Sequence, residues 1–237
     1  MAKRLVCFIS FFIFFSIGPT AQSATIKGKI IYEGEKPKLK EIKMDADPIC
    51  LGFHKEQTHP QTITLGENNE MANVFVHIVE GLPKKAWPVP IEPLVLNQKG
   101  CMYDPAVFGV MAGQPVKILN PDGTLHNVHA LSKINPEFNL AMPKFRTEVT
   151  KIFDKPEFMF AIKCDVHPWM VTWGTVTDHP FFDTTDLTGT YEIKDVPAGT
   201  YVIEAWQQRL SPQRVNVTIA EGETKETDFK FSRPDKK

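Results

Sequence analysis

The apolar positions of this chain fall in short runs that are typical of β-strands. The runs are rich in β-branched and aromatic residues, and glycine, proline or aspartate separates one from the next. No long stripe of apolar residues with the 3.6-residue period of a helix appears. We therefore predict an all-β protein of sandwiches or barrels with Greek-key connections. The runs lie at residues 25–34, 72–81, 92–98, 114–120, 147–153, 157–164, 171–178, 189–196, 199–206 and 213–222.

Two stretches depart from this pattern. Residues 132–148 are less regular, and we expect a short helix or a long loop there. The charged tail after Phe231 is expected to fray.

The runs divide into blocks. Residues 93–178 form one block and residues 182–231 another. The second block contains Asp186, Gly189, Tyr191, Ile193 and the run Val196–Tyr201. In these residues it resembles the carboxypeptidase-regulatory-like β-sandwich, which is an immunoglobulin-like fold. We predict that residues 25–90 and 182–231 build that sandwich, with residues 93–178 inserted between the two parts. One continuous irregular sandwich, or two sandwiches in series, is the alternative.

The N-terminal segment has the features of a signal peptide. A basic start precedes an apolar run from Leu5 to Ile17, and Ala21 and Ser23 provide small residues for cleavage. We expect residues 1–23 to be removed after export, which in a Gram-negative cell means delivery to the periplasm. The later sequence contains no second apolar run that could span a bilayer, so no stable membrane anchor is expected after cleavage.

The charge of the chain argues against two classes of partner. The 27 lysine and arginine residues nearly balance the 28 aspartate and glutamate residues. No block of basic residues stands out, so nucleic acid and anionic membranes are poor partners.

Three cysteines follow the signal peptide, and an odd number in an oxidising compartment needs an explanation. If Cys164 binds a metal ion, Cys50 and Cys101 remain as a pair. We favour a disulfide between them. The alternative is a second metal site in which His54 and His59 join the two cysteines.

A metal-binding motif follows the strand-like run 157–164. Cys164, His167 and Met170 lie within one short loop of sequence CDVHPWM. Thiolate and thioether sulfur favour copper, and a thioether is a poor ligand for zinc, the main competing metal. A three-coordinate site with a weak axial methionine needs a second histidine, and His126 in the segment LNPDGTLHNVHA is the best candidate.

The pair of segments HNVHA and CDVHPWM resembles the cupredoxins, the small blue copper proteins. The spacing Cys-x-x-His-x-x-Met, with proline after the histidine, is the ligand loop of amicyanin. The chain thereby resembles methylamine-utilisation and plastocyanin-like periplasmic proteins. The resemblance implies one type 1 copper, with His126, Cys164 and His167 as equatorial ligands and Met170 as axial ligand. It also implies that Asn127 ties the two ligand loops together.

Two residues compete for places in this ligand set. His129 lies three positions after His126, and residues three apart on a strand face opposite sides, so only one of them can face the metal. Met142 is a weaker rival for the axial position, because a methionine in a loop more often packs. Trp169 is either packed in the core or part of an exposed apolar patch.

These features predict one-electron transfer rather than an enzymatic activity. The motif contains no pair of residues for acid–base catalysis and no nucleophile triad. By resemblance, the redox partner is a cytochrome c or a periplasmic dehydrogenase. The alternative is a module for copper binding, copper delivery or partner binding. An oxidase or reductase would need a second copper centre.

Overall fold

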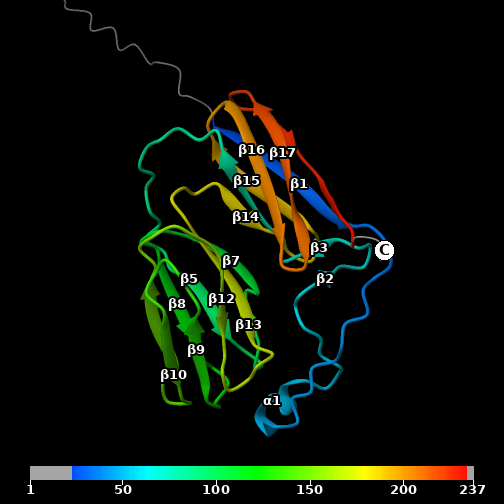
Figure 1. The fold of residues 1–237 in the computed structure, drawn as a ribbon, viewed down its shortest axis with the longest axis vertical. Coiled ribbons are helices and arrows are strands. Elements are labelled where there is room, and N and C mark those ends of the chain that lie inside the picture. Colours follow the sequence, from blue (N-terminus) through cyan, green and yellow to red (C-terminus); the bar gives the residue numbers. More distant parts are fainter. Residues whose placement is uncertain (1–22, 234–237) are drawn as a thin grey trace, which may run out of the picture.

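The computed structural model describes residues 23–233, and the regular secondary structure of these residues is almost entirely β-strand. Figure 1 shows two layered bodies, one built from the middle of the chain and one from its two ends. This confirms the predicted all-β class. The proposed signal peptide lies outside the described residues, apart from Ser23, and so does the end of the charged tail.

The middle of the chain forms a two-sheet body that we call sandwich A. One sheet has the strand order β10-β9-β12-β13-β7, and the other has the order β11-β8-β5-β6. Apolar side chains of both sheets, such as Ile118 and Ile162, meet in one core. The strands are β5 (Leu94–Gln98), β6 (Tyr103–Asp104), β7 (Val107–Met111), β8 (Pro115–Leu119), β9 (His126–Ala130), β10 (Phe138–Met142), β11 (Glu148–Ile152), β12 (Glu157–Lys163) and β13 (Val171–Thr177).

The two ends of the chain together form sandwich B. One sheet has the order β15-β1-β18, with β19 also paired to β1, and the other has the order β14-β4-β16-β17. Its separate core includes Ile26, Val76 and Ile203. The strands are β1 (Ala24–Tyr32), β4 (Phe75–Glu80), β14 (Phe182–Thr184), β15 (Thr190–Val196), β16 (Gly199–Gln207), β17 (Leu210–Ile219), β18 (Thr224–Glu226) and β19 (Phe229–Phe231).

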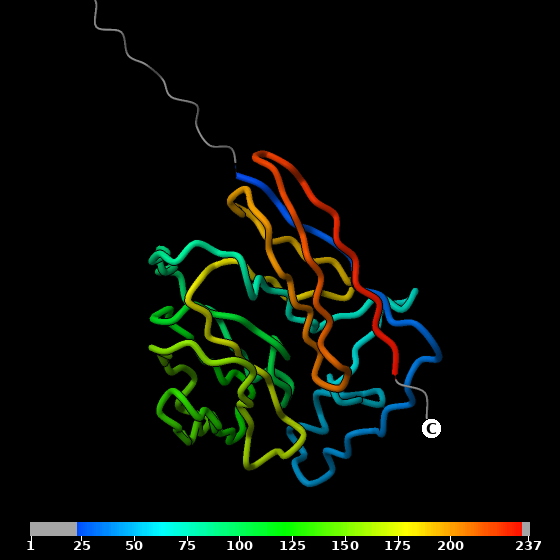
Figure 2. Tube along the Cα trace, turned by 45° about the horizontal axis from the view of Figure 1, so that its top comes forward, coloured from blue at the N-terminus to red at the C-terminus, as the bar shows by residue number. Residues whose placement is uncertain are grey.

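The chain leaves sandwich B after β4 and returns to it at β14. Strands β1 and β4 come from the N-terminal part, and they pair with strands from the C-terminal part. Figure 2 shows the blue and red ends of the trace side by side. This path is compatible with an insertion of residues 93–178, whose boundaries stay a prediction.

The connection between β1 and β4 runs from sandwich B to one end of sandwich A (Figure 1). It holds α1 (Pro48–Phe53) and the short pair β2 (Thr64–Leu65) and β3 (Met71–Ala72). Asp47 caps the N-terminus of α1, and its side chain accepts hydrogen bonds from the amides of Ile49 and Cys50. No helical period in the sequence predicts so short a helix.

A disulfide attaches α1 to sandwich A. Cys50 and Cys101, which are 51 positions apart in the sequence, are bonded, and this confirms the predicted pair. Because each sulfur is bonded to the other, the alternative of a second metal site is wrong. Of its other members, His54 contacts the Gly100 carbonyl oxygen and His59 is exposed.

The irregular stretch 132–148 contains a strand rather than a helix. Strand β10 pairs in antiparallel register with β9 at the edge of its sheet, and this replaces the helix or long loop expected from the sequence. The alternation in FNLAM suits a strand, with Met142 buried and Asn139 exposed. Among residues 23–233, no helix is long and apolar enough to cross a membrane.

Candidate metal centre

Three side chains that can bind a metal ion meet at one end of sandwich A. His126 begins β9, Cys164 follows the last residue of β12, and His167 lies in the loop between β12 and β13. The Nδ1 atoms of the two histidines are 2.9 Å apart, and Cys164 Sγ lies 3.7 Å from His167 Nδ1. The ligand atoms of all three lie within 4.8 Å of one another, and all three residues are buried.

The strand register explains this meeting. Strands β9 and β12 are antiparallel neighbours, so the start of β9 and the end of β12 reach the same edge of the sheet. The loop after β12 is closed by two backbone hydrogen bonds. The amide of Cys164 donates to the Met170 carbonyl (3.1 Å), and the amide of Met170 donates to the His167 carbonyl (2.9 Å). The loop therefore returns to its starting point and turns the histidine inward.

Asn127 connects the two segments that carry the candidate ligands. Its amide donates to Cys164 Sγ (3.4 Å), and its side-chain oxygen accepts the amide of Asp165 (2.5 Å). Its side-chain nitrogen donates hydrogen bonds to Asn139 Oδ1 and Asp165 Oδ2. These contacts hold the start of β9 against the loop after β12.

Two carboxylates occupy the far sides of the imidazoles. Asp122 Oδ2 lies 3.0 Å from His126 Nε2, and Asp47 Oδ2 lies 3.1 Å from His167 Nε2. The sequence reasoning missed both. Asp122 lies only four positions before His126, which is a signal that could have been noticed. Asp47 is 120 positions from His167, and nothing in the local sequence connects them.

Burial and neighbouring groups shift the pKa values of all three candidate ligands. Burial opposes a charge on His126, but the hydrogen bond to Asp122 and the contact with Cys164 outweigh it and raise the pKa of His126 to about 9. Burial raises the pKa of the Cys164 thiol, yet the contact with His126 and the Asn127 amide bring the pKa below its ordinary value. Burial lowers the pKa of His167.

This donor set fits a soft metal ion. Two imidazole nitrogens and one sulfur face the same small volume, away from solvent. The two Nδ1 atoms are so close that a proton or a cation must lie between them, since two bare lone pairs would repel each other. A thiolate and two imidazoles suit copper and also zinc, and a thioether would favour copper.

The two methionines of interest differ in their partners. Met170 and Met142 are both fully buried in the core of sandwich A. Met142 lies opposite His126 in the β9–β10 register, and its sulfur accepts a hydrogen bond from Gln98 Nε2 (3.2 Å). Met170 closes the loop that carries Cys164 and His167. The sulfur of Met142 thus already has a protein partner.

His129 does not join the group. Its ring nitrogens contact Asp165 (2.9 Å) and Glu137 (2.9 Å), and the residue is only partly buried. His126 is fully buried on the same strand. The alternation of side chains along a strand gives the two histidines different surroundings.

Helix α1 and its disulfide cover the edge of the His167 ring. Cys50 Sγ lies 3.5 Å from His167 Nε2, and only 2% of His167 is exposed. The Trp169 ring packs beside His167 with centroids 5.1 Å apart, and its Nε1 donates to the Cys101 carbonyl (3.0 Å). Trp169 is therefore half-buried packing rather than an open apolar patch.

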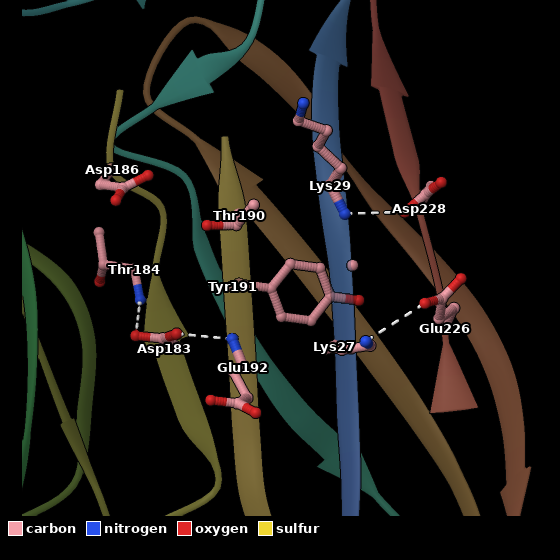
Figure 3. Close-up of a pocket in the computed structure, with 11 residues that line it drawn as sticks. Lys27, Lys29, Asp183, Thr184, Asp186, Thr190, Tyr191, Glu192, Glu226 and Asp228 are labelled. Atoms are coloured by element: carbon pink, nitrogen blue, oxygen red, sulfur yellow. Dashed lines mark hydrogen bonds and ion pairs between the residues drawn. The ribbon is translucent and has the colours of Figure 1, made fainter. Parts of the chain in front are cut away.

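A separate hollow lies on sandwich B. It has a volume of about 650 Å³ and is lined by strands β1, β14 and β15 and the segment around β18. Figure 3 shows that its side chains carry charges of both signs, with Lys27 paired to Glu226. It shares no residue with the candidate metal centre.

Comparisons with known proteins show only distant likenesses. No family profile matches the chain, and no curated protein does. A copper-containing nitrite reductase from Thermus scotoductus SA-01 is 18% identical over 41% of this chain, with a TM-score of 0.33, and the match spans 25% of that enzyme. A purple cupredoxin from Nitrosopumilus maritimus is 18% identical over 35% of this chain and 99% of its own, with a TM-score of 0.30.

A third likeness is to the Cu(I) form of an amicyanin variant. It is 23% identical over 43% of this chain and 98% of its own, with a TM-score of 0.33. At these TM-scores the likenesses decide neither fold nor activity, which must rest on the geometry of the chain itself.

Proposed function

We propose that this protein transfers single electrons through one type 1 copper ion. His126, Cys164 and His167 would hold the ion, with Met170 as the weak fourth ligand. The observation that carries the proposal is the buried meeting of one sulfur and two imidazole nitrogens within 4.8 Å. Bound copper would supply the Cu(II)/Cu(I) couple. The protein would supply a rigid set of ligands that changes little when the charge of the ion changes.

The surroundings of the group support electron transfer rather than substrate turnover. Every candidate ligand comes from the chain, and the group is buried, so no position is evidently left open for a substrate. Within residues 23–233, the other clusters of potential ligands share His126 or His167 and include a sulfur of the Cys50–Cys101 disulfide. They offer no independent second copper site for an oxidase or reductase.

The same proposal covers the organisation of the chain. Residues 93–178 would form a cupredoxin domain inserted into a regulatory-like sandwich of residues 25–90 and 182–231. The protein would be exported to the periplasm after cleavage of residues 1–23. It would exchange electrons there with a cytochrome c or a dehydrogenase.

The closed site favours electron transfer over copper delivery. A protein that delivers copper must release it, whereas α1 and the disulfide lie against His167. Loss of Cu(I) to a mild chelator should therefore be slow compared with electron exchange. Rapid loss would instead support the delivery alternative.

The proposal is tested by adding Cu(II) to the purified metal-free protein. One copper per chain, an intense thiolate-to-copper band in the visible spectrum and the narrow copper splitting of a type 1 centre in the EPR spectrum are expected. The variant Cys164→Ser should lose the band, because an alcohol cannot replace the thiolate. A wild-type protein that binds copper without this band contradicts the type 1 assignment.

A further inference from the structure

Asp47 connects helix α1 to His167. Its Oδ1 accepts the amides of Ile49 (2.8 Å) and Cys50 (3.3 Å) at the start of the helix. Its Oδ2 accepts the Thr124 hydroxyl (3.0 Å) and lies 3.1 Å from His167 Nε2. One oxygen thus holds the backbone of the helix, and the other faces the imidazole.

Asp122 makes the corresponding contacts on the other side. Its Oδ1 accepts the amide of Gly100 (2.8 Å), and its Oδ2 accepts the amide of Cys101 (2.7 Å) and lies 3.0 Å from His126 Nε2. Gly100 and Cys101 both have positive φ angles, which aim two successive amides at the same carboxylate. Only 7% of Asp122 is exposed, so this carboxylate is fixed in the core.

The disulfide joins the two arrangements. The amide of Cys50 binds Asp47, the amide of Cys101 binds Asp122, and the two sulfurs are bonded to each other. One covalent link therefore fixes both carboxylates relative to each other. They in turn lie on the Nε2 atoms of the two imidazoles whose Nδ1 atoms face each other.

We propose that Asp47 and Asp122 are positioning residues of the metal centre, held as a pair by the Cys50–Cys101 disulfide. Each carboxylate accepts Nε2–H of one imidazole, which leaves Nδ1 of His167 and of His126 to face the metal. This inference rests on the proposed copper site. It adds that both histidine ligands have a carboxylate partner, which makes the imidazoles more basic. Two negative charges beside the site also favour Cu(II) over Cu(I).

The substitution of aspartate by asparagine separates charge from shape. Asparagine remains a good residue at the start of a helix, so Asp47→Asn keeps α1. The control is Asp45→Asn, an exposed position in the same segment, which removes the same charge without touching an imidazole. A milder second variant is Thr124→Val, which removes one hydrogen bond from Asp47 and no charge.

The first experiment needs no copper. Long-range ¹H–¹⁵N spectra of the imidazoles in the metal-free protein should show Nε2–H on both His126 and His167. Asp47→Asn should speed the exchange of the His167 proton with water at least tenfold and leave His126 unchanged. Thr124→Val should give a smaller change in the same direction, and Asp45→Asn none. If neither ring carries a proton on Nε2 in the wild-type protein, the inference is overturned.

The second experiment measures the reduction potential of the copper-loaded protein. Asp47→Asn and Asp122→Asn should each raise it, and each tenfold change in the preference for Cu(I) corresponds to about 59 mV for one electron. Asp45→Asn should leave the potential unchanged. Equal potentials in all variants overturn the role of the carboxylates. If the wild type lacks the type 1 spectrum, the copper proposal fails, and the metal-free spectra still decide whether the carboxylates hold the imidazoles.

Discussion

His126 and His167 face each other through their Nδ1 atoms at 2.9 Å, although 41 positions separate them in the chain. Two bare nitrogens cannot remain that close, so one of them carries a proton in the metal-free protein. The pKa of His126, raised to about 9, places that proton on His126 at neutral pH. A metal ion bound between the two rings, as proposed, would have to displace this proton. Metal binding would then be coupled to the protonation of one ring.

The first prediction concerns the choice between the two histidines of β9. His126→Ala should abolish the thiolate-to-copper band or convert it to that of a different copper centre, because one of two nitrogen ligands is lost. His129→Ala should keep the band, because His129 contacts Asp165 and Glu137 instead. Visible and EPR spectra of the two copper-loaded variants decide the matter, and the reverse pattern would make His129 the ligand.

The second prediction separates the two methionines. Met170→Leu should change the copper EPR spectrum and the reduction potential, because the thioether of the ligand loop is lost. Met142→Leu should leave both nearly unchanged, since the Met142 sulfur accepts a hydrogen bond from Gln98. Leucine has a similar volume, so both variants should fold. A spectral change confined to Met142→Leu would assign the axial position to that residue.

The third prediction uses Glu157, a buried carboxylate away from the metal centre. Burial raises its pKa, but hydrogen bonds from Ser132, the Lys133 amide and Asn135 outweigh burial and lower the pKa to about 2. Because the folded pKa lies below its ordinary value of 4.5, the stabilisation is present above pH 4.5. It is lost as the pH falls toward 2.

Urea unfolding of the metal-free protein between pH 7 and pH 2.5 measures this loss. Glu157→Gln should be less stable at pH 7 and should lose less stability on acidification than the wild type. The control Glu56→Gln, at an exposed position, should follow the wild-type curve. Parallel curves for the wild type and Glu157→Gln would show that this carboxylate contributes nothing.

The fourth prediction tests the contact between the two ends of the chain. Gly28 lies in β1, and an added Cβ would stand 1.9 Å from the Thr227 carbonyl oxygen. Gly28→Ala should therefore separate β1 from the C-terminal segment and reduce the free energy of unfolding by about 3 kcal/mol. Gly52→Ala, where an added Cβ meets nothing within 4 Å, should be close to neutral. Chemical denaturation of both variants gives the comparison.

Local patterns were sufficient to predict much of the fold. Strands β13 and β16 follow from apolar residues and turn signals that lie next to each other in the sequence. The alternation of side chains between the two faces of a strand also distinguishes His126 from His129 on β9. The edge strand β10 and the six-residue helix α1 escaped prediction, because pairing with β9 and attachment through the disulfide stabilise them, and neither is visible in the local sequence.

The residues of the candidate site also fall into those that the sequence predicted and those that only the structure revealed. Cys164, His167 and Met170 could be named as candidate ligands from the sequence by itself because one loop carries them, and their residue types and spacing predict a copper site. Only the tertiary structure decided that Asp47 lies on His167 and Asp122 on His126. The contact between Asp47 and His167 depends on the path of the long connection after β1 and on the disulfide that attaches this connection to sandwich A. Contacts between residues so far apart in the sequence depend on the packing of the whole chain, so no local stretch of sequence can predict them.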